Sequence, residues 1–503
     1  MKFKILFLFI VVLNPVKVFS LQELTLYQSD RKIIIDGKLD DWGGIEKIPV
    51  NLTPSGEKNV PSADINVEAM FTFDVRNFYA CIISKDDKFE FPNRSWRYGD
   101  GLYLTFVDPY RGNGSDRSFS YGFSIQGKRA TKVLVYRDGK YFPEMSVAGI
   151  NAKIISDSTT KTITYEISLP WKYIIPFKPF IHKRWGINLI YVDRDFGQRK
   201  ILQLYPDPDY DTELTDIRKG AIFNFVPHIP EDYEFQIATN GFHFYQDTEK
   251  VIICAINSPG ISRRWRIEYE LGFKGEIFPH AKYISLKKGM NIFRLILKNK
   301  NYSTGVYNLK VRIIDNKNSI KFKWWKEFFI LNRGELESYY LRINRIRGNI
   351  FYINDTVVKE SIPVVEIRLK WIEKFMESAT PFADIKQVYK WYQEFNELIE
   401  RLGKGRPALF PPGRIMRLAH RSKIDSTLQP YSVFLPENYD DKKVFPLFVT
   451  LHGSGVDERA TIRYVSRVLK KWGNWIVLAP RARGLSDWYL GNSGKDVIEC
   501  IHH

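Results

Sequence analysis

Runs of apolar residues that alternate with polar ones dominate the first part of the chain. Between residues 24 and about 228 these runs are short, and Gly, Asn, Asp and Pro separate them. A period of two with this punctuation predicts β-strands, and many short strands in succession are typical of a sandwich or jelly roll. The runs are KIIID, VEAMFTF, NFYACII, GLYLTFVD, KVLVYR and TITYEISLP.

A second set of strand patterns follows a break at residues 226–234, VPHIPEDYE, where two prolines stand among acidic residues. This set extends from residue 232 to about residue 331. The number and length of its strands fit an immunoglobulin-like sandwich of about 100 residues. Its runs are KVIICAI, RWRIEYEL, NIFRLIL and VYNLKVRIID.

The hydrophobic period becomes helical after residue 334. In DIKQVYKWYQEFNELIERLGKG, apolar residues recur three and four positions apart, which predicts a helix with Asp384 as N-cap and Gly403 as its stop. The preceding stretch VVEIRLKWIEKFMES has the same pattern. We interpret the apolar stripe as core rather than as a ligand site. The stripe comprises Ile385, Val388, Trp391, Phe395, Leu398 and Ile399.

Strand and helix patterns alternate after the Pro/Gly break GRPALFPPGRI at residues 405–415. Strands that alternate with helices predict the beginning of a parallel α/β sheet. The predicted fold class is therefore multidomain, with an all-β sandwich, an immunoglobulin-like β-sandwich, a helical spacer and a partial α/β unit. The corresponding ranges are 1–20 for a signal peptide, 21–230, 231–332, 333–404 and 405–503.

Charge and cysteine content exclude some classes of function. The net charge is +18, but the basic residues are scattered among acidic ones, which does not fit the clustered footprint of a nucleic-acid-binding protein. We therefore expect no nucleic-acid partner. Cys81, Cys254 and Cys500 are too widely spaced for a metal site or a disulfide framework, and we expect single buried thiols.

The first twenty residues have the layout of a secretory signal peptide. Lys2 and Lys4 precede an apolar run at residues 5–13, and the small residues Val18 and Ser20 fit a cleavage site after Ser20. We expect a secreted, periplasmic or cell-surface protein. The apolar run is shorter than the roughly 20 residues that span a bilayer, and no later stretch is long and apolar enough, so no transmembrane segment is expected.

Five segments of the first domain carry a resemblance to a known family. IIIDGKLDDW, at residues 33–42, has an Asp-Gly turn between apolar runs and is closed by Asp40, Asp41 and Trp42. Together with the later segments it resembles the carbohydrate-binding module family 9-like domains over about 200 residues. The later segments, in order, are NFYACIISKDD, WRYGDGLYLTFVD, YEISLPWKYI and WGINLIYVDRD.

The resemblance implies a polysaccharide or oligosaccharide ligand that stacks on a tryptophan just before the GD turn. The matching residue is Trp96, and Arg97, Tyr98 and Asp100 stand beside it. Exposed aromatic faces and polar side chains suit the flat faces and hydroxyl rims of sugars. This chain has Leu102 and Tyr103 where members that bind sugar well tend to carry an acid, so a domain that has kept only the fold is the alternative. Trp42, Trp171 and Trp185 border strand patterns, and we expect them to be structural.

An acidic run, PDPDYDTELTD at residues 206–216, is the candidate cation site. Oxygen ligands suit hard cations, and the family often carries structural calcium, so Asp207, Asp209 and Asp211 are candidate ligands. A helix-loop-helix calcium loop would need Gly and Glu where this sequence has Thr212 and Arg218. A solvated acidic loop that binds no metal is the alternative. No other cofactor is expected.

The last segments resemble the first strands of an α/β-hydrolase, closest to secreted esterases of the polyhydroxybutyrate-depolymerase and feruloyl-esterase type. YSVFLPENY, PLFVTLHGSG and NWIVLAPRARG carry this resemblance over about 80 residues. It implies an oxyanion-hole loop formed by His452, Gly453, Ser454 and Gly455, in which His452 fixes the loop. The nucleophile of this fold stands at Gly-Xaa-Ser-Xaa-Gly, and the sequence holds no such pattern. We therefore expect no catalytic residue within this chain and a hydrolase domain that continues beyond it.

Three functions remain open from the sequence. The first is the front part of a secreted serine esterase that acts in polysaccharide breakdown. The second is a non-catalytic extracellular carbohydrate-binding or adhesion protein. The third is a secreted serine peptidase of the same α/β fold.

Overall fold

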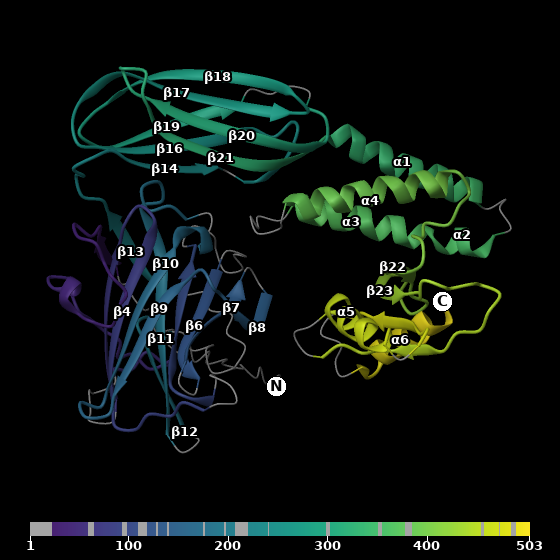
Figure 1. The fold of residues 1–503 in the computed structure, drawn as a ribbon, viewed down its shortest axis with the longest axis horizontal. Helices are drawn as coiled ribbons and strands as arrows, with labels where there is room; N and C mark the ends of the chain where they lie inside the picture. Colours follow the sequence, from purple (N-terminus) through teal and green to yellow (C-terminus); the bar gives the residue numbers. More distant parts are fainter. Residues whose placement is uncertain are drawn as a thin grey trace, which may run out of the picture.

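The computed structural model describes residues 23–503 except 59–64, 93–97, 109–117, 127–128, 138–139, 175–176, 196–197, 207–219, 240, 298–301, 351–354, 378–384, 454–456, 472 and 484–488. In chain order it contains two β-sandwiches, a helical layer and a small α/β unit (Figure 1). The predicted multidomain, mainly β fold class is confirmed. Within the described residues no helix has both the length and the apolar character needed to cross a bilayer.

Two sheets form the first sandwich. The first sheet has the strand order β1-β13-β11-β5-β6-β7-β8, with β12 paired to β11, and the second has the order β2-β3-β4-β10-β9. The strands of the first sheet are β1 (Glu23–Tyr27), β5 (Gly101–Val107), β6 (Ser118–Gln126), β7 (Arg129–Arg137), β8 (Lys140–Ser146), β11 (Arg184–Asp195), β12 (Gln198–Gln203) and β13 (Ala221–Val226). Those of the second are β2 (Ile48–Pro49), β3 (Ile65–Phe73), β4 (Asn77–Asp86), β9 (Asn151–Asp157) and β10 (Thr162–Pro170), and the short helices η1 (Asp40–Trp42) and η3 (Trp171–Tyr173) flank the sheets.

Alternation along the strands builds the core of this sandwich. Every second residue of β10, beginning with Ile163, is fully buried between the sheets, as period-two patterning requires. Trp171 and Trp185 are buried in the same core, and Trp42 lies in a smaller cluster on the opposite face of the second sheet. The structural interpretation of these three tryptophans is confirmed.

The conspicuous segment IIIDGKLDDW is held against the sheet by one buried carboxylate. Glu166 of β10 points away from the main core, and its Oε1 accepts a hydrogen bond from Trp42 Nε1 at 2.8 Å. Its Oε2 accepts from the backbone N–H of Gly37. Gly37 has a φ of +91°, and an added Cβ would lie 2.1 Å from Ile155 Cδ1, so only glycine fits this turn. The Asp-Gly turn and the tryptophan thus belong to one structural unit.

The second sandwich packs a three-stranded sheet, β14-β16-β19, on a five-stranded sheet, β15-β21-β20-β17-β18. Inward-facing residues of β17 and β20 fill its core, beginning with Trp265 and Tyr307. The strands are β14 (Glu234–Thr239), β15 (His243–Tyr245), β16 (Lys250–Ser258), β17 (Ser262–Phe273), β18 (Glu276–Leu286), β19 (Gly289–Leu297), β20 (Gly305–Ile314) and β21 (Ile320–Leu331).

A buried glutamine joins the two sandwiches. Gln236 of β14 is 4% exposed; its Oε1 accepts from Phe180 N at 3.0 Å, and its Nε2 donates to Val75 O at 3.0 Å. Ala255 of β16 belongs to the core of the first sandwich, and Met290 packs against it. Because a buried amide with both ends bonded is costly to disturb, this contact fixes the first sandwich against the second.

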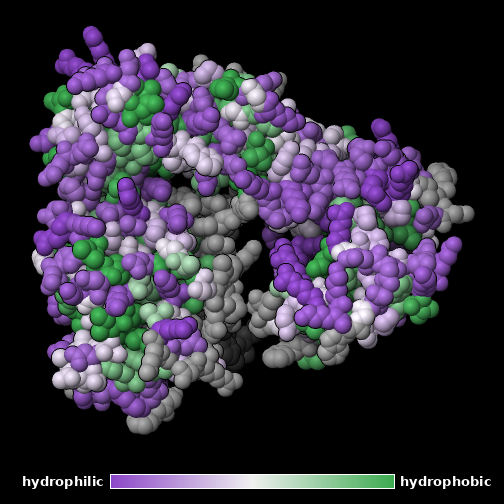
Figure 2. Space-filling model, viewed as in Figure 1, coloured by the Kyte–Doolittle hydropathy of each residue, from purple (hydrophilic) through white to green (hydrophobic). Residues whose placement is uncertain are grey.

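Four helices follow: α1 (Arg333–Ile350), α2 (Thr356–Glu360), α3 (Ile362–Glu377) and α4 (Ile385–Gly403). The predicted stripe of α4 is confirmed as core, although Trp391 is only partly buried and Tyr392 takes a buried position. The predicted N-cap Asp384 lies outside the described residues. The visible surface of these helices is largely hydrophilic (Figure 2).

The last unit has the sheet order β22-β23-β25-β24. The predicted parallel pair is present, since β24 and β25 are parallel and α5 connects them, but β22 with β23 and β23 with β25 are antiparallel. One hydrophobic cluster runs from β21 through the helices to Met416, Tyr431 and Cys500. The elements are β22 (Ile415–Arg421), β23 (Leu428–Phe434), β24 (Leu447–Val449), α5 (Glu458–Leu469), β25 (Ile476–Pro480) and α6 (Asn492–His502). All three cysteines are free and buried, as predicted.

The Glu166 contact generates a first prediction. Replacing Glu166 with glutamine keeps the shape but turns one acceptor into a donor that faces an N–H group. We expect the free energy of unfolding of the first sandwich to fall by about 1–3 kcal/mol, measured from its urea transition. The exposed Asp30→Asn variant is the control. Equal stability of E166Q and wild type would contradict the anchoring role of Glu166.

Candidate functional site

Three buried carboxylates meet at one end of the first sandwich. Asp86 ends β4, Asp100 immediately precedes β5, and Asp193 lies near the end of β11. Each offers one oxygen atom, and these oxygens lie within 4.8 Å of one another. The side chains are 1%, 0% and 1% exposed. Strand ends from both sheets therefore bring together acids that are far apart in the sequence.

Asp100 is in this cluster rather than on the surface, which corrects its expected contact with a sugar. Its Oδ2 accepts from Glu90 N at 2.6 Å, and its Oδ1 accepts from Arg194 N at 2.9 Å. Asp100 N also donates to Glu90 O at 2.9 Å. A Cβ on Gly99 would lie 2.1 Å from Glu90 O, so the glycine of the GD turn permits this approach. The pair fastens the base of the loop between residues 90 and 100.

The other two acids are less well satisfied. Asp86 accepts from Lys88 N at 2.9 Å and from Tyr191 Oη at 3.3 Å. Asp193 Oδ1 is buried and has no hydrogen-bond partner. In the part of the chain that the structure describes, no Lys or Arg forms an ion pair with Asp86, Asp100 or Asp193. Burial of like charges without a counter-charge is costly.

Burial and mutual repulsion raise the pKa of all three acids above the usual value of about 4. Loss of hydration, together with the charges of the neighbouring acids, raises the pKa of Asp86 to about 6, that of Asp100 to about 7 and that of Asp193 to about 8. Near neutral pH the cluster therefore holds protons unless a cation replaces them.

A hard divalent cation fits this donor set. Carboxylate oxygens are the ligands that Ca²⁺ prefers, and the orphaned Oδ1 of Asp193 supplies an oxygen that no protein donor uses. Asp86, Asp100 and Asp193 are therefore the residues that would hold the ion. The acids named for this role from the sequence, Asp207, Asp209 and Asp211, lie outside the described residues.

Of the predicted sugar-binding residues, the structure describes Tyr98 and Asp100. Tyr98 is 59% exposed, two residues before Asp100. Trp96 and Arg97 lie outside the described residues. Sequence reasoning missed Asp86 and Asp193, although both stand in quoted segments, NFYACIISKDD and WGINLIYVDRD. Acids at the ends of two buried strands were the signal that could have identified them.

The predicted oxyanion loop of the last unit is partly described. His452 Nε2 lies 2.7 Å from Arg481 O, and its Nδ1 lies 3.2 Å from Gly453 O. Tyr489 Oη accepts from His452 N at 2.8 Å and donates to His452 O at 3.0 Å. These contacts tie His452 to Tyr489 and Arg481, and its role in an oxyanion loop stays a prediction. Gly453 is exposed, and Ser454 and Gly455 lie outside the described residues.

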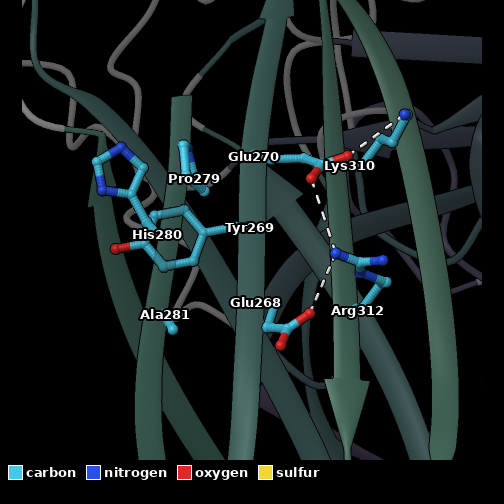
Figure 3. Close-up of a pocket in the computed structure, with 8 residues that line it drawn as sticks. All are labelled: Glu268, Tyr269, Glu270, Pro279, His280, Ala281, Lys310 and Arg312. Carbon is cyan, nitrogen blue, oxygen red and sulfur yellow. Dashed lines mark ion pairs between the residues drawn. The ribbon is translucent and has the colours of Figure 1, made fainter. Parts of the chain in front are cut away.

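The second sandwich has an open pocket on its surface (Figure 3). The acidic and basic side chains that line this pocket form ion pairs with one another. Arg312 lies 3.1 Å from Glu268 and 3.7 Å from Glu270, and Lys310 lies 3.3 Å from Glu270. Beside them the rings of Tyr269 and His280 stack at 5.1 Å. These half-exposed pairs satisfy one another across neighbouring strands, which is typical of a solvated sheet face.

The raised pKa values generate a second prediction. In the absence of divalent cations the folded sandwich binds more protons than the unfolded chain between about pH 4 and pH 8. Its stability should therefore be greatest at the acidic end and fall as pH rises through about 6 to 8. Ca²⁺ should restore the stability at pH 8, because the ion replaces the protons. Thermal unfolding with chelator or with Ca²⁺ measures both effects.

The variant Asp193→Asn tests which residues are responsible. It removes one buried charge, so we expect a smaller loss of stability with rising pH and a weaker response to Ca²⁺. The exposed Asp157→Asn variant should behave like the wild type. A wild-type stability that does not change between pH 5 and pH 8, or no response to Ca²⁺, would rule out this account of the cluster.

Comparisons with known proteins concern the fold of part of the chain. No family model matches the sequence, and no curated protein matches it. Among solved structures, it is similar to a carbohydrate binding module family 9 from Caldicellulosiruptor kristjanssonii in complex with cellotriose, with TM-score 0.32, 11% identity, and coverage of 41% of this chain and 95% of that chain. The same module in complex with glucose has TM-score 0.32 and 12% identity, with coverage of 41% and 97%. A CARDB domain of the PF1109 protein from Pyrococcus furiosus, in complex with di-metal ions, has TM-score 0.17 and 9% identity, with coverage of 20% and 88%.

Proposed function

We propose that this chain is a carbohydrate-binding multidomain protein and that its first sandwich binds the saccharide. The observation that carries the proposal is the pairing of an exposed ring with an anchored base: Tyr98 is 59% exposed, and Asp100, two residues later, is completely buried and bonded on both oxygens. An exposed aromatic ring on a fixed support is the arrangement that stacking on a sugar face requires. The five sequence segments that resemble the family 9-like domains, in the same order along the chain, also support a saccharide ligand.

The anchored base lowers the cost of binding. Glu90 and Asp100 are joined by hydrogen bonds in both directions. Residues that are already held in place lose less conformational entropy when a ligand binds. We propose that Ca²⁺ at Asp86, Asp100 and Asp193 completes this support, so that the ion holds the loop and leaves the sugar contacts to Tyr98, Trp96 and Arg97.

The predicted signal peptide supports a function outside the cytoplasm. We propose a secreted, periplasmic or cell-surface location, where polysaccharides are accessible. The three cysteines are free thiols, so the large hydrophobic cores of the two sandwiches, rather than disulfides, would stabilise the protein at such a location.

We propose as a second candidate function that the α/β unit belongs to a serine esterase that acts on polysaccharide-linked acyl groups. The parallel β24–α5–β25 unit and the loop fixed by His452 favour this function. A secreted peptidase of the same fold and a purely adhesive protein are the alternatives. The mechanism would be acyl transfer through a serine ester, with backbone N–H groups after His452 stabilising the oxyanion.

The sugar-binding proposal is tested by retention on insoluble polysaccharides. Trp96→Ala and Tyr98→Ala should each weaken retention by about fivefold or more, because stacking on a ring contributes about 1 kcal/mol beyond area burial. Tyr283→Ala is the matched control, since Tyr283 is an exposed tyrosine of the second sandwich (74%). Binding to cellulose, xylan, mannan and chitin is measured for each variant by depletion assays. No retention of wild type on any of them, or equal losses in Y98A and Y283A, would defeat the proposal.

The esterase candidate predicts a pattern of labelling with a fluorophosphonate probe, which reports an activated serine. The 503-residue chain should not be labelled, because Ser493 is 5% exposed at the start of α6 and the sequence has no Gly-Xaa-Ser-Xaa-Gly turn. A form that carries such a turn in addition to these residues should be labelled and should hydrolyse p-nitrophenyl acetate. Labelling of Ser454 or Ser493 in the 503-residue chain would overturn the assignment of the oxyanion loop.

A further inference from the structure

A second cluster of potential metal ligands lies in the last unit, far in sequence from the first sandwich. His420 is on β22, and Asp496 and Glu499 are one helical turn apart on α6. One ligand atom from each lies within 4.8 Å of the other two. His420 is 4% exposed and Asp496 is 2% exposed, whereas Glu499 is only half-buried. The cluster therefore lies beneath α6 and opens toward solvent at Glu499.

The environment of His420 points to a bound metal ion. Both of its ring nitrogens are buried, and neither has a hydrogen-bond partner. A buried polar group without a partner costs about 1–3 kcal/mol. Its Nε2 lies 3.7 Å from Glu499 Oε2, which is too long for a hydrogen bond. Zinc–ligand bonds of about 2.0–2.2 Å place two ligands of a tetrahedral ion about 3.4 Å apart, so the observed separation suits two ligands of one ion.

The two carboxylates are held in place by neighbouring groups. Asp496 accepts from Ser422 Oγ at 3.0 Å and from Arg483 Nε at 2.5 Å. Glu499 Oε2 accepts from the backbone N–H of Lys423 at 3.1 Å. Only one bond is made to Asp496 Oδ2, so this oxygen keeps a free lone pair. Supporting donors of this kind orient the ligands of metal sites.

Charge at the cluster also favours a cation. Arg483 pairs with both Asp496 and Asp425, and the charge of Lys423 acts on Glu499. Three carboxylates therefore share two basic side chains, and a divalent ion would offset the surplus negative charge.

We infer that His420, Asp496 and Glu499 bind one divalent transition-metal ion, for which zinc is the best match, and that the ion cross-links β22 to α6. One imidazole with two carboxylates is a ligand set that zinc accepts, and water would complete the tetrahedron. Ca²⁺ fits less well, because it takes six to eight oxygen ligands. This site is independent of the proposed carbohydrate binding.

Zinc titration of the purified, chelator-treated chain tests the inference. Excess Ca²⁺ is present throughout, so that the acidic cluster of the first sandwich does not compete for zinc. We expect one tightly bound Zn²⁺ per chain in competition with a chromophoric chelator, together with a higher melting temperature. Co²⁺ in the same site should give the visible absorption of a tetrahedral complex.

Variants separate this site from adventitious binding. His420→Gln and Glu499→Gln should each weaken zinc binding at least about 100-fold, beyond the usual loss from a supporting residue. The exposed residue His502 supplies the control, and the variant His502→Asn should bind zinc like the wild type. Far-UV circular dichroism checks that each variant is folded.

Two outcomes would overturn the inference. One is that the folded wild-type chain binds no zinc at micromolar concentrations. The other is that zinc binding persists unchanged in both H420Q and E499Q. If H420Q does not fold, E499Q decides by itself, because Glu499 is partly exposed and its replacement leaves the core intact.

Discussion

The cost of burying a carboxylate is the constraint on which the special positions of this chain depend. Glu166 meets that cost with two N–H donors, from Gly37 and Trp42, and the N-terminal segment folds around it. Asp496 meets it with Arg483 and Ser422. Asp86, Asp100 and Asp193 are different, because the cluster has few donors and one oxygen has none. Buried acids with N–H or O–H donors therefore anchor backbone turns and side chains, and the acids that lack donors are the candidate ligands of a cation.

The helices and the α/β unit share one hydrophobic core. Carboxylates at their contact are likewise paired, here with arginine side chains. The guanidinium of Arg417 on β22 stacks over the ring of Trp371 on α3, 3.7 Å from its centroid. Its Nη2 lies 2.7 Å from Oε1 of the fully buried Glu458, and this contact is an ion pair without hydrogen-bond geometry. Arg368 of α3 pairs with Glu394 of α4 at 2.9 Å and donates to Arg417 O at 3.2 Å. Such desolvated pairs add more to the specificity of an interface than to its stability. They fix α3 on β22, and the continuous hydrophobic cluster joins these helices to the second sandwich through β21.

This arrangement relates the two proposed functions to one another. The buried contacts of Gln236 join the first sandwich to the second, and the shared core joins the second to the helices and the α/β unit. A saccharide held at Tyr98 would therefore be attached, through packed contacts rather than a free linker, to the unit that carries the His452 loop. A binding module that is fixed to its neighbour raises the local concentration of the polymer for any chemistry that the neighbour performs.

Local patterning in the sequence determined the elements and much of the core. Period-two runs predicted the strands, the helical stripe from Ile385 to Ile399 predicted α4, and strand context identified Trp42, Trp171 and Trp185 as structural, because these features depend on near neighbours along the chain. Only the tertiary structure decided which acids meet. Asp100 was expected at the surface beside Trp96, and it is buried because β4 and β11 end next to it. His420 had no motif, since its partners Asp496 and Glu499 lie more than seventy residues away and reach it only when α6 packs on β22. Contacts that depend on long-range packing leave no periodic trace in the sequence, and so the anchored loop and both clusters of candidate ligands emerge from the fold.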